Sequence, residues 1–279
     1  MSDLETRVTN HYTGADLLAT IKGGLVAAGI DPDHAKPEDL KGVDEFHLGG
    51  LEATENFLDP LAITSDLKVL DVGSGIGGTA RFIAGRYGAK VTGVDLTPAF
   101  VETAMALSAM VGMEGTTSFK TGSALKMPVA DGSVDLATMM HVGMNIADKP
   151  ALFAEVARVL VPGGRFALFD LMTRDGEPFD FPVPWATNAD GSQVAEPQVY
   201  RDAAASAGLS LTAERDCHDY GIDFFKRVMA AAAESGPPPI GLHLIMGPTA
   251  QEKYGNAAKA VLNGNIAAWE MTFTKAAEA

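Results

Sequence analysis

A cluster of glycines after one short apolar run is the strongest sign of chemistry in the sequence. The run KVLDV at 68–72 leads into Asp71-Val-Gly-Ser-Gly-Ile-Gly-Gly, which places glycines at 73, 75 and 78. A tight turn from a strand into a helix, with a ligand close by, needs residues without a β-carbon. The spacing predicts a nucleotide-binding turn, and by itself it fits a nicotinamide dinucleotide as well.

Two aspartates frame this loop. Asp71 lies at the end of the first run, where its charge would repel a pyrophosphate but could accept a hydrogen bond from an ammonium group. Asp95 ends the next apolar run, KVTGVD, where a carboxylate can accept hydrogen bonds from both ribose hydroxyls. Simple turn or capping chemistry would also explain single aspartates. The pair favours a nucleoside that carries an amino group, as S-adenosylmethionine does.

A third polar turn, Thr121-Gly-Ser-Ala-Leu, follows the next strand candidate. The Ser123 hydroxyl there could hydrogen-bond an adenine edge, and an ordinary turn explains it equally well. The predicted cofactor-binding residues are Asp71, Gly73, Ser74, Gly75, Asp95, Leu96, Thr97, Ser123, Ala124 and Met140.

Alternating strands and helices must position these residues. Short apolar runs alternate with helical spacing from residue 68 onward, which predicts a parallel sheet with helices on both faces, an α/β fold. The expected strands are 68–72, 90–95, 117–122, 134–140 and 163–172, followed by 209–216 and 269–275.

The remaining segments are expected to cover the sheet. Residues 1–65 have helical apolar spacing and are predicted to form an N-terminal cap, and residues 66–279 the binding domain. Two insertions into that domain, at about 172–198 and 222–265, are expected to act as a lid and pocket wall. A break at Gly236 and the three prolines after it separates helical patterns.

Several motifs in order resemble the class I S-adenosylmethionine-dependent methyltransferases. VLDVGSGIGG is similar to the first motif of that family, VTGVDLT to the acidic second motif and TGSALKMPVADGSVDLATMMH to the third and fourth, while VARVLVPGGRFALFDLM is similar to the segment after the fourth. The resemblance covers about 66–172 and implies a Rossmann-like seven-stranded sheet with an antiparallel last strand. The family often has an acidic residue where Ser123 stands, so the adenine contact here would differ. HVGMNIADK, FPVPWA and DEFH are most similar to bacterial small-molecule methyltransferases that act on glycine-type amines and quinone precursors.

Candidates for the methyl acceptor lie after the strands and in the cap. His141 follows VDLATMM and is the predicted substrate contact or general base, with a structural hydrogen bond as the alternative. Tyr12 and His47 lie in the cap and could close over the cofactor, although cap residues also pack and solvate. Trp185 could face a methylated ammonium or serve as a hydrophobic plug, and Met144 completes the substrate set.

Composition excludes several classes of protein. The chain has 21 Lys and Arg against 36 Asp and Glu, a formal charge of −15, so a nucleic-acid substrate is not expected. The single cysteine, Cys217, fits a reducing cytoplasm, where we expect the protein. No signal peptide, membrane span or metal site is expected.

The sequence thus predicts an enzyme that transfers a methyl group from S-adenosylmethionine to nitrogen, oxygen or sulfur of a small metabolite. A nicotinamide-dependent oxidoreductase and a non-catalytic nucleotide-binding module are the alternatives. The acceptor atom and the need for a general base stay open, as does assembly, with a homodimer as one option.

Overall fold

The computed structural model describes residues 2–12, 16–174, 176–236 and 238–277, and a seven-stranded sheet forms the centre of that part of the chain. The strands are β1 (Lys68–Val72), β2 (Lys90–Asp95), β3 (Thr117–Thr121), β4 (Val134–Met140), β5 (Leu160–Thr173), β6 (Leu209–Asp216) and β7 (Ile266–Lys275). Their order is β3-β2-β1-β4-β5-β7-β6, and β7 runs antiparallel to both of its neighbours. The predicted α/β fold with an antiparallel last strand is confirmed.

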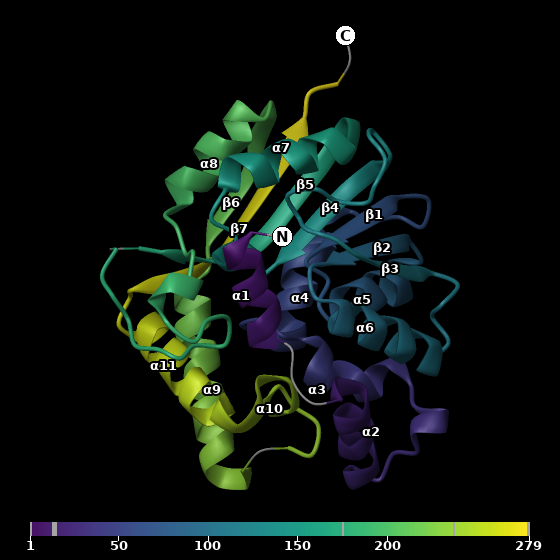
Figure 1. Cartoon of the computed structure of the whole chain (residues 1–279), viewed down its shortest axis with the longest axis vertical. Coiled ribbons are helices and arrows are strands. Elements are labelled where there is room, and N and C mark those ends of the chain that lie inside the picture. Colours follow the sequence, from purple (N-terminus) through teal and green to yellow (C-terminus); the bar gives the residue numbers. More distant parts are fainter. Residues whose placement is uncertain (1, 13–15, 175, 237, 278–279) are drawn as a thin grey trace.

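Helices cover both faces of this sheet. The crossovers are α5 (Gly78–Tyr87), α6 (Pro98–Met110), α7 (Lys149–Val159) and α8 (Pro197–Ser206). Figure 1 shows α7 and α8 on one face and α5 and α6 on the other. The strands β1 and β4 are buried along nearly their whole length, because helices pack on each side of them. Their apolar runs therefore carry little alternation.

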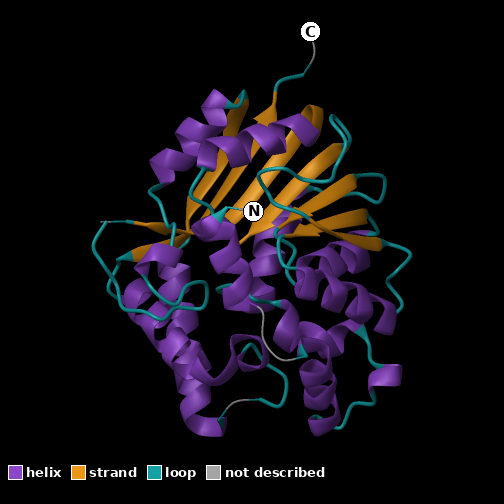
Figure 2. Cartoon of the chain, viewed as in Figure 1, coloured by secondary structure: helices purple, strands orange, loops and turns teal. Residues whose placement is uncertain are grey.

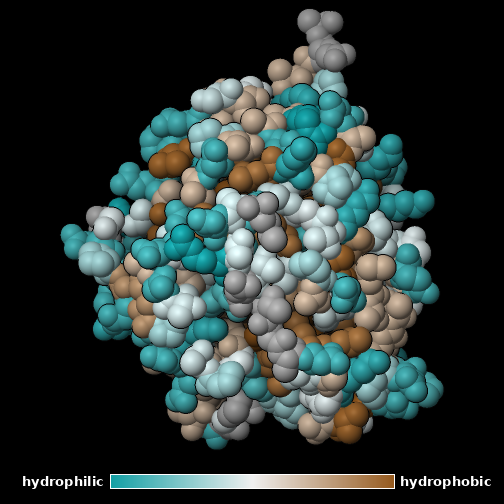
Figure 3. All heavy atoms as spheres, viewed as in Figure 1, coloured by the Kyte–Doolittle hydropathy of each residue, from teal (hydrophilic) through white to brown (hydrophobic). Residues whose placement is uncertain are grey.

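The other helices gather beyond one end of the sheet (Figures 1 and 2). They are α1 (Asp3–Tyr12), α2 (Leu17–Ala27), α3 (Lys41–Asp44), α9 (His218–Ser235), α10 (His243–Met246) and α11 (Ala250–Leu262). Helix α4 (Gly50–Leu58) packs on the sheet instead, where the ring of Phe57 lies 6.0 Å from that of Phe169 in β5. The predicted helical region 222–265 is thus divided among three helices, and α9 ends at the glycine that opens the predicted break. In Figure 3, the face that carries α1 is mostly hydrophilic, with hydrophobic residues in separate groups. No helix in the described ranges is long and apolar enough to cross a membrane.

One buried cluster joins the cap to the rest of the molecule. Ile21 and Leu25 of α2 pack with Phe100 and Leu107 of α6, and all four side chains are almost fully buried. At roughly 1.5–3 kcal/mol for each large apolar side chain removed from water, this contact fixes the cap firmly.

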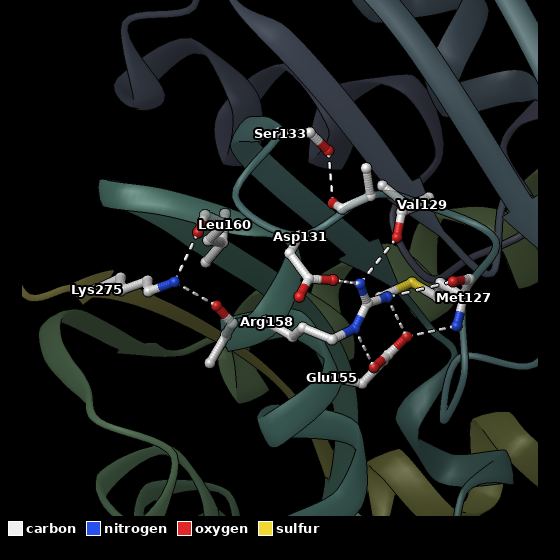
Figure 4. A network of polar contacts seen from close by, with 10 residues as sticks. Met127, Val129, Asp131, Ser133, Glu155, Arg158, Leu160 and Lys275 are labelled. Carbon is white, nitrogen blue, oxygen red and sulfur yellow. Dashed lines mark hydrogen bonds and ion pairs between the residues drawn. The ribbon is translucent and has the colours of Figure 1, made fainter.

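A polar network around Arg158 of α7 holds the loop between β3 and β4 in place. The Arg158 guanidinium of α7 donates to Glu155 Oε1 at 2.6 Å and to the main-chain oxygens of Val129 at 2.9 Å and Met127 at 3.2 Å, and it pairs with Asp131 (Figure 4). This network holds the loop that begins at residue 122 against α7.

Candidate functional site

A cavity of about 530 Å³ lies beyond the carboxyl ends of β1, β2 and β4, where open α/β sheets bind ligands. Of the predicted residues, thirteen line it: Gly73, Ser74, Gly75, Asp95, Leu96, Thr97, Ser123, Ala124, Met140, His47, His141, Met144 and Trp185. Asp71 lies behind the glycine loop and is not among the lining residues of the described chain. Tyr12 is the last residue of α1, and its side chain lies outside what the structure describes. The half of the cavity at residues 73–75, Asp95 and Ser123 is called here the glycine-loop end.

The glycine loop is shaped by its backbone. Gly73 has φ +71°, and a β-carbon there would collide with the side chain of Val142. The amide of Gly73 donates to Val94 O at 2.7 Å, which hooks the loop onto β2. A β-carbon at Gly78 would collide with the main chain of Asp44. These positions therefore accept only glycine, one for its conformation and one for the approach of the cap.

Asp95 holds the loop by its carboxylate. Its Oδ2 accepts from the Gly75 amide at 2.8 Å and its Oδ1 from the Thr97 amide at 2.8 Å. Burial raises the pKa of Asp95, and the two amide hydrogen bonds oppose that rise. The Thr97 side chain donates a further hydrogen bond to this carboxylate, which leaves lone-pair capacity for a ligand hydroxyl in the cavity.

Two polar atoms beside the loop have no partner among the described residues. Asp71 is only 2% exposed; its Oδ1 accepts from Thr138 Oγ1 at 3.2 Å, while its Oδ2 is unpaired. Burial raises the pKa of Asp71 to about 7. The buried Oγ of Ser74 is unpaired as well. Unpaired buried polar atoms are costly, and a bound ligand commonly satisfies them.

The cap is joined to the loop by a buried ion pair. The Arg81 guanidinium of α5 donates from Nε to Asp44 Oδ2 at 3.1 Å and from Nη2 to Asp44 Oδ1 at 2.5 Å. Both side chains are buried, at 1% and 7% exposure. Burial raises the pKa of Asp44 although the charge of Arg81 opposes the rise. The pair holds residues 44–48 against the cavity.

The next residues of the cap form a second buried pair. His47 Nε2 lies 2.9 Å from Glu45 Oε2 and Nδ1 lies 3.1 Å from Leu48 O, while the Thr54 hydroxyl donates to the same Glu45 oxygen. Burial pushes the pKa of Glu45 upward, but the hydrogen bond and charge of His47 outweigh it and leave the pKa lowered. Both nitrogens of His47 therefore have protein partners.

His141 is also fully engaged. It has a left-handed backbone, with φ +54°, a conformation in which histidine is enriched among non-glycine residues. The Leu48 amide donates to its Nε2 at 3.3 Å, so its Nδ1 carries the proton and donates to Phe169 O at 3.2 Å. Burial lowers the pKa of His141 well below its usual value, and the charge of His47 lowers it further. These contacts favour a structural role for His141, as a neutral imidazole that links the cap to β5. They do not favour a role as general base.

The other half of the cavity, called here the apolar end, is formed by segments far apart in the sequence. The side chain of Trp185 is 3% exposed, and its Nε1 donates to Ser192 Oγ at 2.9 Å. Sequence reasoning missed most of this wall because single apolar residues carry no local motif. The lining residues include Phe46, Met144, Trp185, Phe225, Met246 and Val261.

Helix α1 lines the cavity through Leu4, Glu5 and Val8, and residues at both of its ends bind other segments. His11 Nε2 donates to Pro184 O at 2.9 Å, so its Nδ1 accepts from the Thr187 hydroxyl at 3.1 Å. Near the other end, a hydrogen bond with Ser123 is the main cause of the lowered pKa of Glu5. Ser123, predicted to contact a ligand, thus also contacts α1.

A buried lysine fixes the loop after β4. Lys149 Nζ donates to the main-chain oxygens of Gly143 at 2.9 Å, Ile146 at 2.5 Å and Gln193 at 3.0 Å. Burial lowers its pKa to about 8, and the charge of Asp170 opposes this shift. In the described ranges, no group of three His, Cys, Asp or Glu residues could hold a metal ion.

The glycine-loop end lies in a segment that is similar to a known protein family. Residues 70–168 match the family model described as a methyltransferase domain. The match covers both aspartates, the glycine loop and His141, and it stops before the segments that build most of the apolar end.

Relatives of this domain extend well beyond the chain. The chain is 39% identical over 101 residues to an Arabidopsis thaliana tocopherol O-methyltransferase, covering 36% of this chain and 29% of the relative. It is 30% identical over 184 residues to phosphoethanolamine N-methyltransferase 3 of the same plant, covering 66% of this chain and 37% of the relative. The chain thus spans only about a third of each relative's length.

A solved structure shares the fold over almost the whole chain. The geranyl diphosphate C-methyltransferase of Streptomyces coelicolor, solved with S-adenosyl-L-homocysteine, superposes with a TM-score of 0.70 and covers 98% of both chains. Its sequence identity to this chain is 16%, so the likeness concerns the fold.

Proposed function

We propose that the chain is an S-adenosylmethionine-dependent methyltransferase that acts on nitrogen, oxygen or sulfur of a small molecule. The observation that carries the proposal is the continuous cavity, with a polar glycine-loop end fitted to a nucleoside and an apolar end beyond it. When bound, S-adenosylmethionine supplies a methyl group that is already activated on a sulfonium.

The residues at the glycine-loop end fit this cofactor. Asp95 has free lone pairs for ribose hydroxyls, and the buried unpaired Oδ2 of Asp71 and Oγ of Ser74 can accept hydrogen bonds from a ligand that reaches the loop. At Gly75 a β-carbon would meet nothing within 4 Å, so its bare backbone borders open space. Asp71 is suited to an ammonium group, whose charge would lower the carboxyl pKa.

The protein's contribution to the transfer is orientation and exclusion of water. The Glu45–His47 pair and His141 fix the position of residues 45–48 against β4 and β5. We assign both histidines a positioning role in this wall. The acceptor would meet the methyl group where His141 and Met144 border the apolar end.

Methyl transfer is tested with cofactor that carries a deuterated methyl group. The enzyme is incubated with an extract of small metabolites, and products are detected by mass spectrometry. A labelled product together with S-adenosylhomocysteine supports the proposal. If the protein binds a nicotinamide dinucleotide and no adenosyl compound, the proposal is wrong.

A further inference from the structure

The charged residues around the cavity are of one sign. Its described lining residues include Glu5, Asp44, Asp95 and Asp148, and among them there is no lysine or arginine. The formal charge of the chain is −15, so the long-range field has the same sign as the local one. An anionic group entering this cavity would be repelled, and no lysine or arginine of the described lining could pair with it.

The two buried lysines near the wall cannot serve as that cation. Lys149 Nζ donates to three main-chain oxygens, and Lys253 Nζ donates to Met246 O at 3.1 Å. Met246 itself lines the cavity, but Lys253 does not. Both ammonium groups bind carbonyls of the wall and are not presented to a ligand.

The wall of the apolar end is aromatic and aliphatic, and it includes Trp185, Phe225 and Val261, which are almost fully buried. Asn145 is also among the lining residues, but its Oδ1 is buried and is not presented to a ligand in the cavity.

From this arrangement we infer that the methyl acceptor is a lipophilic molecule without an anionic group. This inference rests on the proposed methyl transfer and names its substrate class. A carboxylate or phosphate in such a wall would be buried without a partner, which costs several kcal/mol or more. Burial of the acceptor's apolar surface in this wall favours binding by about 25 cal/mol for each Å² removed from water.

The experiment compares probes that differ only in an anion. N-methyloctylamine and para-butylphenol are each paired with an analogue that carries a carboxylate at the far end of the chain, and phosphoethanolamine is added as a phosphorylated amine. The sequence has two tryptophans, so a Trp269→Phe enzyme reports binding through Trp185 alone. Titrations are made with S-adenosylhomocysteine present, and transfer is followed with deuterated cofactor.

We expect at least one pair member without an anion to bind and its carboxylate analogue to bind at least about 100-fold more weakly. Ala257→Phe fills the cavity and should abolish binding. The matched control is Ala231→Phe, because Ala231 of α9 is exposed and does not line the cavity, and this variant should bind the probes like the wild type.

Equal or tighter binding of the carboxylates or phosphoethanolamine would overturn the inference, and so would failure of every anion-free probe to bind. Calorimetry with S-adenosylmethionine keeps the two proposals separate. A protein that binds the anion-free probes but not the cofactor would refute methyl transfer, whereas one that binds the cofactor and prefers anions would refute only the substrate class.

Discussion

The glycine-loop end and the apolar end of the cavity are built in different ways. The first is formed mainly by consecutive residues that follow β1, β2 and β3, and its polar atoms are either fixed by amides or left unpaired. The second is formed by side chains from residues 46, 144, 185, 225 and 246, far apart in the sequence. The cavity thus combines a binding site made by local backbone geometry with an apolar wall that forms only when the whole chain is folded.

The ion pair that joins the cap to the glycine loop gives the largest expected effect. Arg81→Met leaves Asp44 buried without its partner, which should lower the free energy of unfolding by about 3–5 kcal/mol. Urea unfolding measures it, and the double variant Asp44→Asn/Arg81→Met should recover most of the loss. A single variant as stable as the wild type would show that the cap does not depend on this pair.

The unpaired carboxyl behind the loop should make stability depend on pH. The pKa of Asp71 is raised from 3.8 to about 7 in the folded protein, so its contribution is full below about pH 4 and is lost as the pH rises through 7. Asp71→Asn should remove a fall of up to about 4 kcal/mol over that window. Urea unfolding at several pH values compares the two proteins.

The cofactor gives a control for this pH effect. A bound ammonium should lower the carboxyl pKa and flatten the fall in stability of the wild type. Identical pH profiles for the wild type and Asp71→Asn would contradict the account of this residue.

The division of roles between the two ends predicts unequal effects on cofactor affinity. Asp95→Ala removes the acceptors for Gly75, Thr97 and the proposed ribose contact, so we expect S-adenosylmethionine to bind about 10–100-fold more weakly. His141→Ala should change that affinity less than about threefold, because its nitrogens bind main-chain atoms. Calorimetry measures both, and the reverse order would refute these assignments.

The smallest effect is expected at α1. His11→Phe removes the hydrogen bonds from α1 to Pro184 and Thr187, and should raise the KM for the acceptor about threefold while lowering the free energy of unfolding by no more than about 1–3 kcal/mol. Initial rates at saturating cofactor test the effect on KM. An unchanged KM would mean that the position of α1 does not affect acceptor binding.

The glycine-loop end could be predicted from sequence because its chemistry is local. The loop residues Gly73, Ser74 and Gly75 directly follow β1, and Asp95 is the last residue of β2. All four line the cavity. The seven strands were predicted as well, because apolar runs and helical spacing alternate along the chain. Asp71 was identified as a polar residue at the loop, but its burial behind the loop depends on packing that spacing does not reveal.

The apolar end could not be predicted in the same way. Phe225 and Val261 are ordinary apolar residues on α9 and α11, and only the folded chain brings them to Trp185 and Met144. The hydrogen bond between the Leu48 amide and His141 joins residues 93 positions apart. The sequence alone therefore could not show that this nitrogen is occupied, and His141 was predicted as a possible general base. Arg81 and Asp44 likewise pair only through the packing of the cap on α5.

Isothermal titration with S-adenosylmethionine, S-adenosylhomocysteine and the nicotinamide dinucleotides in one buffer tests most directly which cofactor the glycine-loop end binds. We expect both adenosyl compounds to bind and the dinucleotides not to bind. Binding of a nicotinamide dinucleotide alone would contradict the assignment of the glycine-loop end and of Asp71.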